Sequence, residues 1–184
     1  MIISTGMADM EEILEAVETA KLGGCKELAI LHCVSGYPAP AKDYNLKTLV
    51  DMQERFRLVT GLSDHTISNA TAIASVGLGS SIIEKHVTLS RAEGGVDAAF
   101  SMEPSELKDL CSSVSIAYKA IGKGSFEMKP AEESNIKFRR SIYVSKNVKK
   151  NENITDQNIK IVRPAKGLEP KYYYKLILKK FKKD

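Results

Sequence analysis

Two histidines, His65 and His86, stand at positions in the sequence where their side chains could bind a metal ion. Each follows a short apolar run, at residues 56–60 and 81–83, that predicts a buried strand, and residues 69–78 between the runs are typical of a helix. The pattern predicts a β-α-β unit with one histidine at the carboxyl end of each strand. Chemistry in α/β barrels sits at those ends, because the loops there converge on one pocket.

Adjacent parallel strands lie about 4.8 Å apart, so imidazoles at equal heights can share one cation. Neutral imidazole binds several divalent ions, and two protein ligands leave positions open for water or substrate. Adjacent side chains on a strand point to opposite faces, so we expect Asp64 and Glu84 to face away from the pocket, into the helix layer. Asp64 is expected to form a structural ion pair. Glu84 is expected either to support the metal ligands or to have no role. On spacing alone, a structural role for both histidines is the alternative.

Composition sets the broad class of the protein. The 184 residues carry a net charge of +4 and 43% hydrophobic side chains, enough for one or two domains. No apolar run approaches the roughly 18 residues of a membrane span, and no signal peptide is evident, so we expect no membrane partner. Three cysteines, Cys25, Cys33 and Cys111, lie in or beside apolar runs, which indicates reduced thiols and a cytoplasmic location. The lysine-rich ending, residues 171–183, is interpreted as a short helix with a solvated face, not as a nucleic-acid site.

Strand and helix signals alternate through the first 122 residues. Asp9, with Glu12 three residues later, predicts a capping box, and Asn45 is expected to cap the second helix. The expected strands are residues 1–4, 27–33, 56–60 and 81–83, and the expected helices are 10–22, 45–56, 69–78 and 105–121. Four such units are half of a closed (β/α)8 barrel, which needs roughly 200 to 250 residues.

The rest of the chain predicts a linker and a small β-rich domain. Residues 123–137 are charged, carry Pro130 and have no periodic apolar pattern. Strand-like segments follow at residues 140–145 and 159–162. The expected organisation is α/β: a half barrel over residues 1–122, a linker over 123–137 and a small domain over 138–184.

Four motifs in order resemble the sialic acid synthase family, whose members condense phosphoenolpyruvate with an N-acetylated sugar to make nonulosonic acids. The motifs are Leu31-His-Cys-Val-Ser-Gly-Tyr-Pro38, Gly61-Leu-Ser-Asp-His-Thr66, Ile83-Glu-Lys-His-Val-Thr88 and Gly94-Gly-Val-Asp-Ala-Ala-Phe-Ser-Met-Glu-Pro104. The last is most similar to the pseudaminic acid synthase branch, because sialic and legionaminic acid synthases usually carry a Gly-Pro-Asp-His version. The resemblance implies the second half of a TIM barrel followed by an incomplete SAF (antifreeze-like) domain. We therefore expect a fragment, or one product of a split gene.

The resemblance also implies a reaction and a set of site residues. C3 of phosphoenolpyruvate attacks the aldehyde of the open-chain acceptor, water adds at C2, and phosphate leaves with C–O cleavage. His65 and His86 would hold a divalent ion with waters, manganese first, with magnesium or cobalt as alternatives. The other implied residues are Ser35 and Ser63 for the phosphate, Ser4 near the carboxylate, Tyr37 and Asp97 for the acceptor, and Phe138 and Arg163 in the small domain.

The family swaps its small domain across a dimer, so the resemblance implies that Arg163 completes the pocket of a partner subunit. The lysines that neutralise phosphate belong to the other half of the family's barrel, so this chain alone is expected to be inactive and to need an N-terminal half. An acceptor for sialic or legionaminic acid is an alternative to the pseudaminic precursor. A catalytically inactive remnant or assembly module that binds a partner through its open barrel edge is the alternative of another class. His32 is expected to be structural, satisfied by the backbone.

Overall fold

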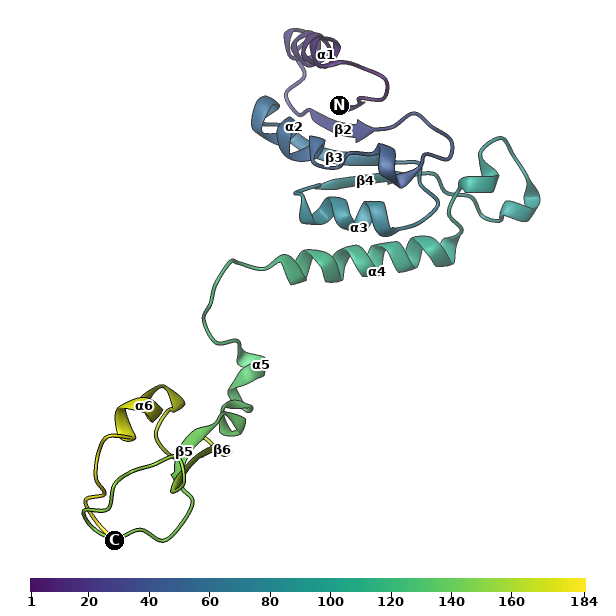
Figure 1. Ribbon diagram of the computed structural model, residues 1–184. Coiled ribbons are helices and arrows are strands. Elements are labelled where there is room, and N and C mark those ends of the chain that lie inside the picture. Colours follow the sequence, from purple (N-terminus) through teal and green to yellow (C-terminus); the bar gives the residue numbers. More distant parts are fainter. The chain divides into compact units, whose positions relative to one another are not determined.

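The computed structural model describes residues 1–184, which divide into two units, residues 1–123 and 124–184. In unit 1, helices pack on a parallel sheet with strand order β1-β2-β3-β4 (Figure 1). Its strands are β1 (Ile2–Ser4), β2 (Ala29–Cys33), β3 (Val59–Asp64) and β4 (Ile82–Lys85). Its helices are α1 (Met10–Leu22), α2 (Thr48–Phe56), α3 (Ala70–Gly77) and α4 (Pro104–Ile121). The expected α/β class with parallel strands is therefore confirmed. No helix has both the length and the apolar character needed to cross a membrane.

The start of α1 agrees with the sequence prediction. The Asp9 carboxylate accepts hydrogen bonds from the backbone N–H groups of Glu11 and Glu12, each at 2.9 Å. The Glu12 carboxylate in turn accepts one from the Asp9 N–H at 2.9 Å, which completes the capping box. The helix ends before Gly23, as expected.

Two expectations around α2 are wrong. Asn45 has a φ of 41°, a left-handed conformation that asparagine tolerates, and α2 begins only at Thr48. The strand predicted at residues 56–60 starts later, because Arg57 ends α2 with a left-handed φ of 51°. The strand itself is β3, Val59–Asp64, and it continues to the residue before His65.

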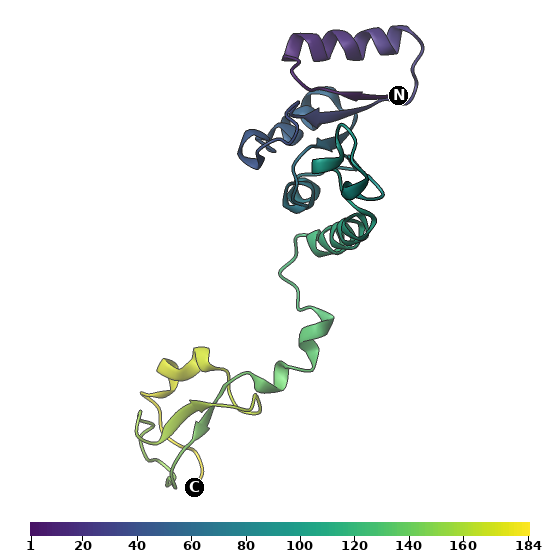
Figure 2. The same ribbon diagram turned by 90° about the vertical axis from the view of Figure 1, so that its right-hand side faces the viewer.

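The two faces of the sheet differ. One face packs on the helices: Ile30 of β2 contacts a cluster with Val17 and Met52, and Leu62 of β3 belongs to a second cluster with Leu110 of α4. Figure 2 shows α3 and α4 next to each other, as their contacts also indicate. On the opposite face, which we call the open face, no residue belongs to either cluster. Leu31 is buried there, but Ile2 and Val59 are 57% and 51% exposed.

Unit 2 is built on a two-stranded antiparallel sheet, β5 (Ser141–Val144) and β6 (Ile159–Val162), which confirms the two predicted strands. Its buried core residues are Ile142, Ile154 and Ile159. Two single-turn helices accompany the strands, α5 (Pro130–Glu133) and α6 (Tyr173–Leu176). The segment expected as a linker thus contains one turn of helix, and the lysine-rich ending contains another.

Candidate metal and substrate site

Strand register decides which side chains share the open face. Ser63 pairs with Glu84, and Asp64 pairs with Lys85. Paired residues of parallel strands point to the same side, and side chains alternate along each strand. His65 follows Ser63 by two residues, and His86 follows Glu84 by two. Both histidines therefore lie at the carboxyl edge of the open face.

The two imidazoles lie next to each other, with ring centroids 5.2 Å apart and an interplanar angle of 68°. His65 Nδ1 lies 2.9 Å from the Val34 carbonyl oxygen, so Nδ1 carries the proton and donates, and Nε2 keeps a free lone pair. His86 Nδ1 lies 3.6 Å from Asp97 Oδ2, and His86 Nε2 makes no hydrogen bond in the chain. Metal-binding histidines have this arrangement, in which one ring nitrogen is held by the protein and the other is free.

The donor set fits one kind of metal site. No group of three or more His, Cys, Asp or Glu side chains in the chain is arranged to hold an ion. The two imidazoles could supply two ligands to one divalent ion. The other positions would then be open to water or substrate, as in sites where the ion acts as a Lewis acid.

Aromatic rings surround the imidazoles. The Tyr37 ring lies 4.3 Å from the His65 ring and 5.8 Å from the His86 ring, centroid to centroid. The Phe100 ring lies 5.2 Å from His86 and 5.8 Å from Tyr37. These rings form an apolar surface beside the histidines. Phe100 was not predicted as a site residue, because no spacing distinguishes it from the other apolar residues of its segment.

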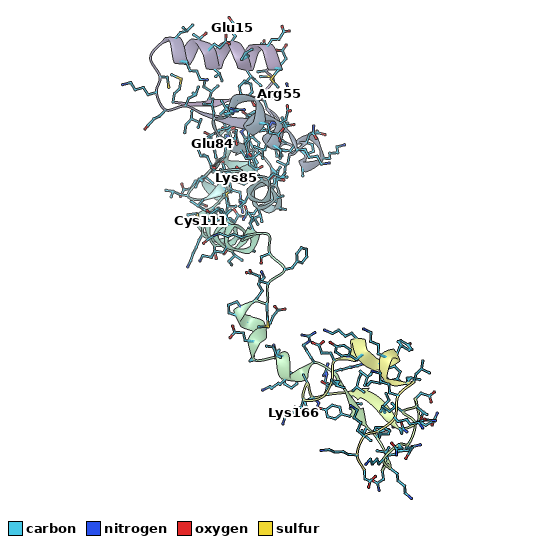
Figure 3. The ribbon with its side chains drawn as sticks, turned by 90° about the vertical axis from the view of Figure 1, so that its left-hand side faces the viewer. Glu15, Arg55, Glu84, Lys85, Cys111 and Lys166 are labelled. Atoms are coloured by element: carbon cyan, nitrogen blue, oxygen red, sulfur yellow. The ribbon has the colours of Figure 1, made fainter.

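The predicted orientation of Glu84 is wrong. Glu84 Oε1 accepts a hydrogen bond from Ser63 Oγ at 2.8 Å, so this carboxylate lies on the open face and not in the helix layer (Figure 3). The reason is that Glu84 precedes His86 by two residues, and two residues on a strand share a face. The expectation for Asp64 is confirmed: its carboxylate pairs with Lys85 Nζ at 2.9 Å, and the two side chains are 0% and 4% exposed.

The three serines differ in what their hydroxyls do. Ser63 is 3% exposed and its hydroxyl proton is donated to Glu84. Ser4 is exposed at the end of β1 and makes no side-chain hydrogen bond. Ser35 packs so closely over Gly6 that a Cβ on Gly6 would collide with Ser35 Oγ, which brings the loops after β1 and β2 together. Ser4 and Ser35 therefore present the available hydroxyls at this edge of the sheet.

A buried tyrosine supports the site from the helix side. The Tyr44 side chain is fully buried, and its hydroxyl accepts the backbone N–H of His65 at 2.6 Å. Removal from water raises the pKa of Tyr44 to about 12, so the phenol keeps its proton at neutral pH. His32 Nε2 lies 2.5 Å from the Tyr44 carbonyl oxygen, which confirms the expectation that His32 is structural. The role of Tyr44 was not predicted, because a tyrosine in a polar loop is ordinarily a surface residue.

Phe138 and Arg163 belong to unit 2. Phe138 is 52% exposed, and the exposed Arg163 makes no hydrogen bond or ion pair in the chain. The Ala165 N–H donates to the Lys137 carbonyl at 3.2 Å, so the segments carrying Phe138 and Arg163 lie side by side.

Comparisons with known proteins add independent evidence. The pseudaminic acid synthase of Campylobacter jejuni is 38% identical over 183 residues, covering 100% of this chain and 53% of that protein. The N,N'-diacetyllegionaminic acid synthase of Campylobacter jejuni is 38% identical over 191 residues, covering 100% of this chain and 57% of that protein. The crystal structure of N-acetylneuraminic acid synthetase from Leptospira borgpetersenii, in complex with citrate, aligns with a TM-score of 0.66 and 34% identity over 75% of this chain and 48% of that one.

The chain thus spans about half the length of the curated relatives it matches. The model of the NeuB family matches residues 1–126, more than half of the chain. This match confirms the family resemblance drawn from the four motifs, and the chain belongs to the NeuB family.

Proposed function

We propose that this chain forms the metal- and acceptor-binding part of a nonulosonic acid synthase, a phosphoenolpyruvate-dependent transferase that forms a carbon–carbon bond. The observation that carries the proposal is the pair of imidazoles of His65 and His86, 5.2 Å apart on the open face of the sheet. Membership of the NeuB family and the named activities of the relatives support the same reaction class.

In this reaction C3 of phosphoenolpyruvate bonds to the aldehyde carbon of the acceptor, water adds at C2, and phosphate leaves with C–O cleavage. A divalent ion, manganese in the first place and magnesium or cobalt otherwise, would polarise the aldehyde oxygen. His65 and His86 would hold it through their free Nε2 atoms. Glu84 lies on the same face and is placed to accept a hydrogen bond from a water or a hydroxyl group beside the histidines.

The substrates would occupy the open face. Ser4 and Ser35 would orient the anionic groups of phosphoenolpyruvate, while Ser63 would act through Glu84. Hydroxyl groups donate hydrogen bonds without neutralising charge, and Lys85 points to the helix side, so a cation for the phosphate has to come from another segment. Tyr37 and Phe100 would contact the apolar surface of the acceptor, and Asp97 would accept its hydroxyls.

The unpaired strand edges and the exposed residues of the open face favour a half barrel. Strands β1 and β4 each have one unpaired edge, and the face that carries the site leaves Ile2 and Val59 exposed. We propose that four further strands close this sheet into a TIM barrel, supplied in the same polypeptide or by a separate N-terminal half, and that unit 2 is an SAF-type domain. Residues 1–184 alone are then inactive, because the pocket is neither closed nor lined with cations.

The experiment mixes this chain with the part of the Campylobacter jejuni pseudaminic acid synthase that it does not cover, and measures phosphate release from phosphoenolpyruvate. We expect release that requires manganese and the 2,4-diacetamido-trideoxy acceptor and that is lost with His65→Ala. Thr60→Val is the control, because Thr60 lies on the other face of the sheet and its hydroxyl has no hydrogen-bond partner, and it should keep the activity. A complex that forms without turnover would instead favour the inactive assembly module. Faster turnover with the legionaminic or sialic acid precursor would change the acceptor assignment.

We also propose that Arg163 serves the pocket of a second subunit in a domain-swapped dimer. Its guanidinium has no partner in its own unit, and its planar donors suit sugar hydroxyls or an acyl oxygen. A mixture of Arg163→Ala and His65→Ala chains should then recover activity, because one site of the mixed dimer carries neither defect. A confirmed mixed dimer without activity would place Arg163 in its own pocket or outside any site.

A further inference from the structure

The two imidazoles are held very differently. His65 lies one residue beyond the end of β3 and is only 6% exposed, whereas the His86 side chain is 31% exposed. The His65 carbonyl accepts the Ala39 N–H at 3.0 Å, and its Nδ1 donates to the Val34 carbonyl. His86 has one backbone bond, from the Met102 N–H to its carbonyl at 2.9 Å, and the longer contact to Asp97. His65 is therefore the fixed member of the pair.

The remaining backbone group of His65 is its N–H, which has no ladder partner because β3 ends at Asp64. A buried N–H without an acceptor costs free energy, so its partner matters. That partner is the Tyr44 hydroxyl, at 2.6 Å. The same hydroxyl points its own proton toward the Ser63 carbonyl, at 3.3 Å. One phenol oxygen thus bridges the backbone on both sides of Asp64, where the chain leaves the sheet.

We propose that Tyr44 is a positioning residue for His65: its hydroxyl replaces the missing ladder partner and fixes the direction in which the imidazole leaves β3. The inference rests on the proposed function, because it assigns Tyr44 to the ion held by the two histidines. Tyr44 does not touch the open face and acts only through the backbone of β3. Without its hydroxyl, the His65 N–H has no acceptor and the ring can rotate away from His86.

Tyr44→Phe removes one oxygen and keeps the ring volume. The control is Thr60→Val, which removes a buried hydroxyl of β3 that has no hydrogen-bond partner. Manganese binding to the 184-residue chain is measured by electron paramagnetic resonance of the free ion. We expect Tyr44→Phe to raise the dissociation constant about tenfold, as loss of a ligand-orienting contact does. Thr60→Val should stay within about twofold. A long-range proton–nitrogen NMR spectrum should show the Nδ1–H tautomer of His65 in the unmodified chain and a tautomer mixture in Tyr44→Phe.

The variant His65→Ala distinguishes a wrong metal site from a wrong role of Tyr44. If His65→Ala leaves manganese binding unchanged, the metal site is wrong, and this inference falls with it. If His65→Ala abolishes binding but Tyr44→Phe behaves like Thr60→Val, the role of Tyr44 is wrong and the metal site stands. Should Tyr44→Phe not fold, the unmodified chain decides: a slowly exchanging Tyr44 hydroxyl proton close to the His65 amide proton supports the inference. A His65 amide that exchanges as fast as the exposed loop amides overturns it.

Discussion

Removal of Lys85 should destabilise unit 1 far more than the loss of an equally short ion pair at the surface. Lys85 Nζ donates to the Asp64 carboxylate at 2.9 Å and to the Thr66 carbonyl, and both charged side chains are almost completely buried. Lys85→Met leaves the carboxylate buried with one donor, the Thr66 N–H at 2.8 Å. Breaking a buried pair from one side costs about 3 to 5 kcal/mol, so we expect a loss of about 3 kcal/mol.

The matched control is Arg55→Met, which breaks the Asp51–Arg55 pair of 2.8 Å whose side chains are 46% and 58% exposed. An exposed pair of this kind contributes about 0.3 to 0.5 kcal/mol. Urea unfolding followed by helical circular dichroism reports mainly on unit 1, because its four long helices dominate that signal. The double variant Asp64→Asn/Lys85→Met removes both charges and should recover about half of the loss. A Lys85→Met effect no larger than that of Arg55→Met, or a double variant less stable than Lys85→Met, would contradict the expected cost of leaving the Asp64 carboxylate buried and unpaired.

Three further predictions concern the elements that position the site. Asp9→Ala should cost about 1 kcal/mol in urea unfolding, because it removes the acceptor for two N–H groups at the start of α1, and no change would contradict the cap. Gly61→Ala should lower the free energy of unfolding by about 2 kcal/mol, since a Cβ there would lie 2.5 Å from a backbone carbonyl of β4. Its control, Gly77→Ala, has open space around the new Cβ and should be neutral or stabilising, and equal effects of the two variants would contradict this geometry. The Arg91 guanidinium lowers the pKa of Glu106, so their contact should be complete above the ordinary glutamate pKa and be lost as pH falls through the lowered pKa. In a carbon-13 NMR titration, Arg91→Gln should raise the pKa of Glu106, and an unchanged pKa would contradict the pairing.

Local patterns predicted most of the elements. The capping box at Asp9, the continuous apolar run of β2 and the periodic stretch of α4 each depend on nearby residues, and the structure confirms all three. The start of α2 and the boundary between α2 and β3 were not predictable in this way. Arg57 and Asn45 adopt left-handed backbone conformations that composition alone does not favour at those positions.

The site was predicted less completely than the fold. The position of His65 and His86 on one face follows from strand period and register. The same period places Glu84 on that face, because it precedes His86 by two residues. The roles of Tyr44 and Phe100 could not be predicted from the sequence. Their roles depend on tertiary contacts, the bond from the His65 amide and the ring packing beside His86, which no spacing along the chain encodes.

Anomalous diffraction from crystals of the chain soaked with manganese tests directly whether His65 and His86 bind one ion. We expect one manganese peak between the two residues, about 2.0 to 2.2 Å from Nε2 of each ring, with the Nδ1 atom of His65 still bonded to the Val34 carbonyl. A peak on one imidazole alone, or no peak at the carboxyl edge of the open face under conditions that load other sites, would contradict it.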